Sequence, residues 1–147
     1  MAGEVRFTIE GAAEMDRLLK ELGPRAASRA ADRALRAGAK PIVQRAKELV
    51  PVDTGDLRDS ITVQIERQRG ASEKRVALVG FTKPTSRRAH LTEYGTAHSP
   101  AKRFMRPALD EQHSSAFGEM GRVLADAINR EAERLAGIRG RRRTSRG

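Results

Sequence analysis

Hydrophobic positions recur with a helical period in three segments of the chain. Residues 12–22 carry a stripe at i, i+3, i+4 and i+7 spacing, which predicts a short helix. Residues 25–49 carry a longer stripe of mainly small side chains, which lets a neighbouring backbone approach this helix closely. Pro41 interrupts the segment and predicts a kink or a break near residues 38–40. A third stripe over residues 107–137 predicts a long C-terminal helix that opens on a proline.

Two segments in the middle of the chain have the period of two residues that is typical of strands. Residues 61–67 alternate strictly between apolar and polar, whereas residues 74–81 are apolar at both parities, which predicts a second strand buried on both faces. The link of residues 68–73 is polar and contains a glycine, so the pair is predicted to form an antiparallel hairpin. Residues 4–10 also alternate and form a candidate edge strand.

Together these elements predict an α+β fold. In it, an antiparallel β-sheet carries a long helix from the N-terminal half of the chain and a long C-terminal helix, both packed on one face. A length of 147 residues is typical of one domain. We expect that domain to span residues 1–138 and to be followed by a disordered tail over residues 139–147.

The stretch of residues 50–58 joins the first long helix to the hairpin. Pro51 has no backbone N–H to donate, so it ends the helix. Gly55 is expected to take a positive φ, and the residues before it can bond nearby backbone N–H groups. A short helical turn that carries Leu57 is then capped by one of two residues, Thr54 or Asp56. The local chemistry favours a structural corner over a catalytic loop.

A second informative stretch, residues 89–96, predicts one helical turn that ends at Gly95. Three residues of types that bind zinc lie in or beside it: His90, Glu93 and His98. Their spacing matches no ligand pattern and Gly95 interrupts the helix between them, so we expect no metal. The chain also lacks a G-x-S-x-G nucleophile elbow and a Gly-rich phosphate loop. We therefore expect neither an enzyme nor a cofactor.

Composition adds a strong positive charge to this picture. The chain has no cysteine, which excludes disulfides, and its net charge of +10 indicates a polyanionic or acidic partner. No apolar run approaches the roughly 20 residues of a membrane span, so no membrane partner is expected. Half of the net charge lies in five arginines of the tail: Arg139, Arg141, Arg142, Arg143 and Arg146. The tail is either an arm that contacts DNA phosphates or a solvated terminus.

Three motifs in a fixed order carry a resemblance to a known family. They are residues 50–61, then Glu93-Tyr94-Gly95-Thr96, then Arg103-Phe104-Met105-Arg106-Pro107-Ala108 at the start of a helix. Over residues 26–135 the chain resembles the neck, or tail-completion, proteins of long-tailed bacteriophages. The resemblance implies a structural virion protein at the head–tail junction, which assembles as a homo-oligomeric ring around the DNA channel. It also implies other connector and tail proteins as partners, and it supplies no catalytic residues.

A subunit of a closed ring needs two different, complementary surface patches. The candidate ring or partner interface comprises Pro51, Asp53, Thr54, Gly55 and Leu57 in the corner, and Glu93, Tyr94, Gly95, Thr96, Arg103 and Phe104 beyond it. The five tail arginines are the candidate contacts with DNA in the channel. A tail-terminator-like component is the alternative position in the particle. A free basic DNA-binding protein is a weaker alternative, since neither a recognition helix nor a stacking platform is found.

Overall fold

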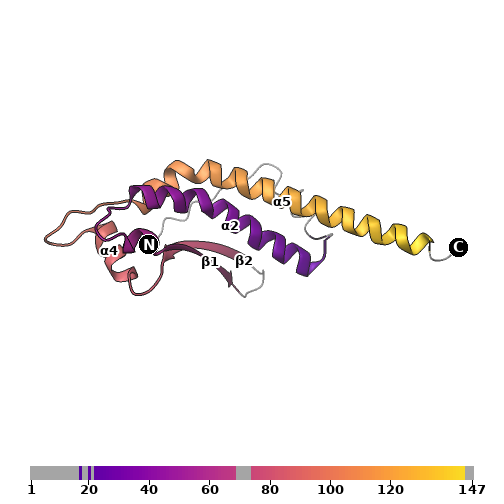
Figure 1. Ribbon diagram of the computed structural model, residues 1–147, viewed down its shortest axis with the longest axis horizontal. Helices are drawn as coiled ribbons and strands as arrows, with labels where there is room; N and C mark the ends of the chain where they lie inside the picture. Colours follow the sequence, from indigo (N-terminus) through magenta and orange to yellow (C-terminus); the bar gives the residue numbers. More distant parts are fainter. Residues whose placement is uncertain (1–16, 18–19, 21, 69–73, 145–147) are drawn as a thin grey trace.

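The computed structural model describes residues 17, 20, 22–68 and 74–144. The elements follow the chain in the order α2 (Pro24–Leu49), α3 (Asp56–Asp59), β1 (Ile61–Gln68), β2 (Lys74–Phe81), α4 (Ser86–Tyr94) and α5 (Met105–Thr144) (Figure 1). The candidate edge strand over residues 4–10 and most of the short helix predicted over residues 12–22 lie outside the described residues.

Three layers make up the body of the molecule. The hairpin of β1 and β2 forms one layer, α2 crosses it and contacts both strands, and α5 runs antiparallel to α2 on the far side (Figure 1). Both long helices therefore lie on the same side of the sheet, and the predicted α+β class is confirmed. A two-stranded hairpin is marginal on its own, so its packing against α2 is what stabilises it.

Helix α2 continues through Pro41 from its first residue to its last. Of the two outcomes predicted near residues 38–40, a kink or a break, the break is therefore wrong. Proline removes only one backbone hydrogen bond, the one to the carbonyl four residues earlier. The turns on either side of it are held by burial against the neighbouring layers, since Gly38 and Ala46 are both buried.

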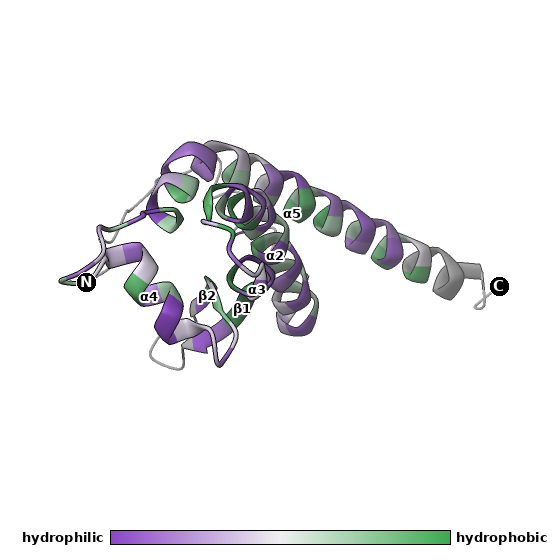
Figure 2. Cartoon of the chain, turned by 60° about the vertical axis from the view of Figure 1, so that its left-hand side comes forward, coloured by the Kyte–Doolittle hydropathy of each residue, from purple (hydrophilic) through white to green (hydrophobic). Residues whose placement is uncertain are grey.

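Small side chains let α2 and α5 approach closely, as their spacing predicted. The buried residues of α2 are Ala30, Ala34, Gly38, Ala39 and Ala46. A Cβ on Gly38 would lie 2.9 Å from the carbonyl oxygen of Ala116 and would collide with the side chain of Met120. The apolar stripes of the two helices face each other along this contact (Figure 2). Small residues that leave room for the neighbouring helix therefore determine the contact as much as larger residues that fill it.

The hairpin is antiparallel over its full length, with Ile61 opposite Phe81 and Gln68 opposite Lys74. Its second strand was predicted to be buried on both faces, and that prediction is wrong, because Leu78 is 44% exposed on the face away from α2. Asp32 of α2 holds the far end of the hairpin through ion pairs with two arginines, Arg67 and Arg75. This contact extends the apolar packing of the same face to the far end of the hairpin.

The main core lies at the end of the molecule where α2 ends and α5 begins. Its buried members are Ala46, Val50, Leu57, Ile61, Ala89, Phe104 and Ala108. Phe104 is fully buried, and its ring meets that of Phe81 edge to face at a centroid distance of 5.9 Å. The corner, the hairpin, α4 and the start of α5 are therefore fixed to one another at this end.

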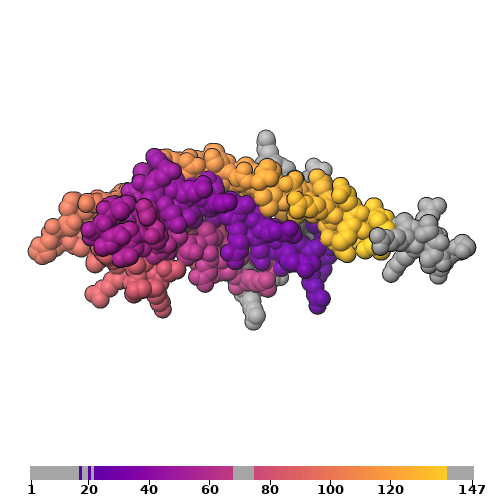
Figure 3. Space-filling model, in the orientation of Figure 1, coloured from indigo at the N-terminus to yellow at the C-terminus, as the bar shows by residue number. Residues whose placement is uncertain are grey.

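The C-terminal part of α5 projects from the opposite end of the molecule (Figure 3). The helix continues to Thr144, so residues 139–144 are helical where the sequence predicted disorder, and residues 145–147 lie outside the described residues. Arginine has a high helix propensity, and extending an existing helix needs no new nucleus. Within the described ranges, no helix is both long enough and apolar enough to cross a membrane.

Candidate functional site

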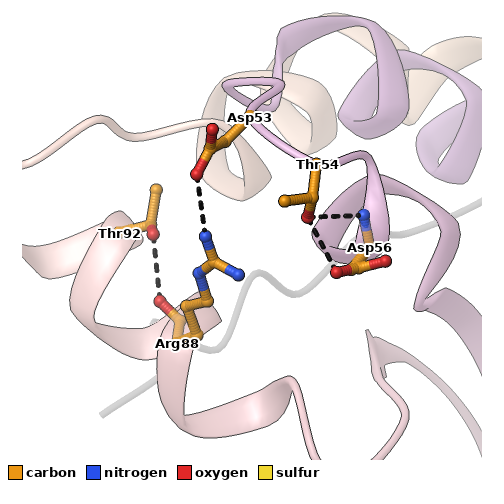
Figure 4. Close-up of polar contacts among 5 residues, drawn as sticks. All are labelled: Asp53, Thr54, Asp56, Arg88 and Thr92. Atoms are coloured by element: carbon orange, nitrogen blue, oxygen red, sulfur yellow. Dashed lines mark hydrogen bonds and ion pairs between the residues drawn. The ribbon is translucent and has the colours of Figure 1, made fainter.

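The corner after α2 takes its shape from one proline and one glycine. Val50 leaves the helix with an extended backbone, at φ −63° and ψ 134°, directly before Pro51. Gly55 has φ 87° and ψ −15°, so the positive φ that the sequence predicted is confirmed. Thr54 stabilises the turn locally: its hydroxyl donates to the carboxylate of Asp56 at 2.7 Å and accepts the N–H of Asp56 at 3.4 Å (Figure 4).

The short helix α3 attaches this corner to the hairpin. Leu57 is buried in the core cluster, while the hydroxyl of Ser60 donates to the Leu57 carbonyl at 2.8 Å. The carbonyl of Ser60 in turn accepts the N–H of Thr82 at 3.0 Å, just beyond the end of β2. The corner is thus bonded to the hairpin through Ser60, with Asp53 exposed on its surface.

Helix α4 ends at Gly95, and the chain then folds back on itself. Gly95 has φ 78° and ψ 178°, a combination that is accessible essentially to glycine alone. The N–H of Lys102 donates to the carbonyl of Thr92 at 2.9 Å, which brings the returning loop against the end of α4. A Cβ on Gly95 would lie 2.7 Å from the backbone nitrogen of Ala101, so the return requires glycine on two grounds.

Glu93 caps the first turn of α5 from a distance in the sequence. One carboxylate oxygen accepts the N–H groups of Phe104 at 2.9 Å and Met105 at 3.1 Å, and the other accepts that of Arg106 at 3.4 Å. Glu93 is 8% exposed, and its bond to Phe104 is buried while those to Met105 and Arg106 are part-buried. A carboxylate at a helix N-terminus satisfies backbone donors that have no partner within the helix and interacts favourably with the helix dipole.

Glu93 is a candidate metal ligand by residue type, and its position indicates a different role. The ring of His90 lies against that of Tyr94, with the centroids 4.8 Å apart. Over the part of the chain that the structure describes, no group of three or more His, Asp or Glu residues is placed to hold a metal ion. Glu93 is therefore a structural capping residue.

The two informative stretches of the sequence meet around one open pocket of about 230 Å³. The corner contributes Pro51, Asp53, Thr54, Gly55 and Leu57, and α4 with the loop after it contributes, among others, Arg88, Leu91, Thr92, Thr96 and Lys102. Six of the residues predicted to form an interface thus line a single surface. The sequence could not show that these stretches, which are about forty residues apart, are neighbours.

An ion pair crosses the mouth of this pocket. Nη2 of Arg88 lies 3.1 Å from a carboxylate oxygen of Asp53, and the side chains are 53% and 83% exposed (Figure 4). The hydroxyl of Thr92 donates to the backbone carbonyl of Arg88 at 2.9 Å, one turn earlier in α4. Such exposed pairs typically stabilise a fold by about 0–1 kcal/mol, so the contact is easily exchanged for another.

The remaining predicted interface residues are divided between surface and core. Tyr94 is 69% exposed and Arg103 is also exposed, so both are available to a partner. Phe104 is completely buried, which corrects its inclusion in an interface: it supports the site from below. Sequence reasoning did not single out Arg88, in α4, or Lys102, in the loop after it, for which the basic composition around residues 82–88 and 102–103 was the only available signal.

Valine at position 55 is expected to destabilise the protein by about 1–2 kcal/mol, because a β-branched residue is strained at positive φ. Space is not the obstacle, since an added Cβ would meet only the guanidinium of Arg58, at 3.7 Å. Denaturant unfolding of Gly55→Val measures the effect. Gly80→Val is the matched control, because Gly80 lies in β2 with open space around it and should tolerate valine. Equal stability of the two variants would contradict the role assigned to Gly55.

Comparison with known proteins places the chain beside a bacteriophage family. The model of a protein family described as "Bacteriophage HK97-gp10, putative tail-component" matches residues 13–95. The matched segment contains α2, the corner, the hairpin and α4, and it ends at Gly95. No curated protein and no solved structure shows significant similarity to the chain.

Proposed function

The chain belongs to the HK97-gp10-like family of bacteriophage tail components, and on that premise we propose that it is a structural protein of the head–tail connector. In this proposal the protein assembles as a homo-oligomeric ring that joins head to tail around the DNA channel. The observation that carries the proposal is the family match itself, which spans more than half of the chain and includes the corner and α4.

The geometry of the pocket surface supports a role in assembly. Its residues come from a corner and a loop that are both fixed to the core by backbone hydrogen bonds, through Ser60 and Thr92. A rigid surface of this kind suits protein–protein contact, because little conformational entropy is lost when it binds. A ring also requires a second, different patch on each subunit, since its contacts are heterologous.

Disruption of the gene tests this proposal directly. Filled heads and complete tails should accumulate separately when a stop codon removes the protein, and electron microscopy of the lysate will show them. Joined particles in that lysate would contradict the proposal. Cryo-electron microscopy of wild-type virions should locate the subunit in the neck; its location on the end of detached tails would favour the tail-terminator alternative instead.

We also propose that the basic end of α5 is an arm that neutralises DNA phosphates in the channel. Truncation after Gly137 removes all five arginines of the tail and is expected to weaken nonspecific duplex binding by the isolated protein. The slope of log affinity against log salt should also become shallower, by about 0.9 for each phosphate that the tail neutralises. Filter binding across a salt series measures both quantities.

The matched control is the full-length chain with the same five arginines changed to glutamine, which keeps the length and removes the charge. If DNA binding is unchanged in both variants while docking to the connector fails, the arm is a protein-binding element and the DNA assignment is wrong. If heads and tails still join while DNA binding falls, the assignment stands.

A further inference from the structure

Most acids that the structure describes on the helices pair with arginines of the same chain. Arg45 pairs with Glu48 and Glu111, and further pairs are Arg106–Asp110, Arg122–Glu119 and Arg134–Glu131. The hydrogen bond from Arg122 also lowers the pKa of the Glu119 carboxyl below its ordinary value. The acids of the helical surface are therefore largely occupied by these pairs.

The pocket combines two cations, Arg88 and Lys102, with one acid, Asp53. Lys102 lines it without an ion pair to any acid of the described residues, and its backbone is fixed by the bond to Thr92. Among the acids that the structure describes, Arg88 pairs only with Asp53, whose carboxylate is 83% exposed. The two cations therefore share a single carboxylate, and a second carboxylate would complete the arrangement. The carboxylate that is present, that of Asp53, is held by a weak, exposed ion pair.

Apolar side chains surround these cations. Leu91 lines the pocket and is 46% exposed, and Pro51 and Pro100 also line it. Val52, which stands between two lining residues in the sequence, is 62% exposed, and Tyr94, two residues after Thr92, is 69% exposed. Concave sites with an apolar lining and a few placed charges are typical of specific recognition.

We infer that this pocket binds an acidic residue, flanked by apolar residues, on a different protein of the particle. In the complex the partner's carboxylate contacts Lys102 and Arg88 and displaces Asp53, which occupies the site in the free chain. The inference rests on the proposed function for the presence of such a partner. It adds the chemistry by which this surface recognises that partner.

A protein fits these observations better than DNA does. Phosphate contacts are made by cations that project from a surface, and they need no apolar surroundings. Here the cations flank a concave site with exposed apolar side chains beside it, among them Leu91. A second copy of the chain is also a poorer match, because most acids that the structure describes already pair with arginines of their own chain, among them Asp110, Glu111 and Glu119.

Complementation tests the inference in a phage whose own gene carries the stop codon. Plasmid-borne Lys102→Glu should restore plaques at least about ten-fold less efficiently than wild type, because close charge pairs at interfaces couple strongly. Lys40→Glu is the matched control, since Lys40 is exposed on α2 outside the pocket. Asp53→Asn should complement at least as well as wild type, because it removes only the internal competitor. Circular dichroism melts of the purified variants verify that each is folded.

Second-site suppressors of Lys102→Glu identify the partner. Suppressors that change an acidic residue of another structural protein to lysine, arginine or a neutral residue support the inference. Suppressors confined to this gene, or normal plaque formation by Lys102→Glu, overturn it. So does a loss of nonspecific DNA binding by Lys102→Glu as large as that caused by truncation after Gly137. If heads and tails join without the protein at all, it is the proposed function that fails.

Discussion

Gly95→Ala is expected to destabilise the protein by about 3 kcal/mol or more, through two effects that act together. Alanine at φ 78° and ψ 178° occupies a region that only glycine reaches without strain. Its Cβ would also lie 2.7 Å from the nitrogen of Ala101 and 2.9 Å from the carbonyl oxygen of Ser99. These are backbone atoms, so no side-chain rotation relieves the contact. Urea unfolding monitored by far-ultraviolet circular dichroism measures the loss.

Gly118→Ala separates this effect from glycine replacement in general. Gly118 lies in α5 with nothing within 4 Å of the added Cβ, so alanine there should stabilise by about 0.5–1 kcal/mol. The change in the free energy of unfolding should therefore have opposite signs for Gly95→Ala and Gly118→Ala. If both variants are at least as stable as wild type, the close return of the chain after α4 is not required by the fold.

Local patterns were sufficient to predict most of the elements. The helical stripe of residues 25–49 and the alternation of residues 61–67 depend on spacing alone, and the structure places α2 and β1 there. Two predictions failed because tertiary context was decisive. The break at Pro41 was avoided because packing holds the helix on both sides, and β2 was judged buried from apolar content, which does not reveal that α2 covers only one face.

The site shows the same division between local and distant information. The positive φ of Gly55 and the end of α4 at Gly95 were predictable, because turn chemistry lies in adjacent residues. The pocket was not predictable, since Asp53 and Arg88 meet only when the corner and α4 pack on the same core. A motif-based prediction could thus name candidate surface residues without showing that they share one surface.

The capping role of Glu93 is the clearest case of information absent from local sequence. Capping boxes are recognised by residues within one turn of a helix start, whereas Glu93 reaches donors eleven to thirteen residues further along the chain. It contacts the start of α5 because Gly95 and the loop after it turn the chain back. The stability of the longest helix therefore depends on the end of a short one.

Removal of this carboxylate should be costly. Glu93→Ala leaves the buried N–H group of Phe104 and the part-buried N–H groups of Met105 and Arg106 without their acceptor, and we expect a loss of about 3 kcal/mol. Glu93→Gln keeps the size and one acceptor oxygen but loses the negative charge, so about half of that loss is expected. Thermal unfolding should show a decrease in Tm of roughly 6–12 °C for the alanine variant.

Glu133 provides the matched control for both variants, because it is exposed on α5 and far from the capped turn. Glu133→Ala and Glu133→Gln should each change the free energy of unfolding by no more than about 0.5 kcal/mol. Amide hydrogen exchange then separates a cap from a general packing contact. Loss of protection in Glu93→Gln should be largest in the first turns of α5, beginning at Ala108, and smaller towards the middle of the helix. Uniform loss along α5 would show that Glu93 stabilises the core as a whole, and the assigned role would then be wrong.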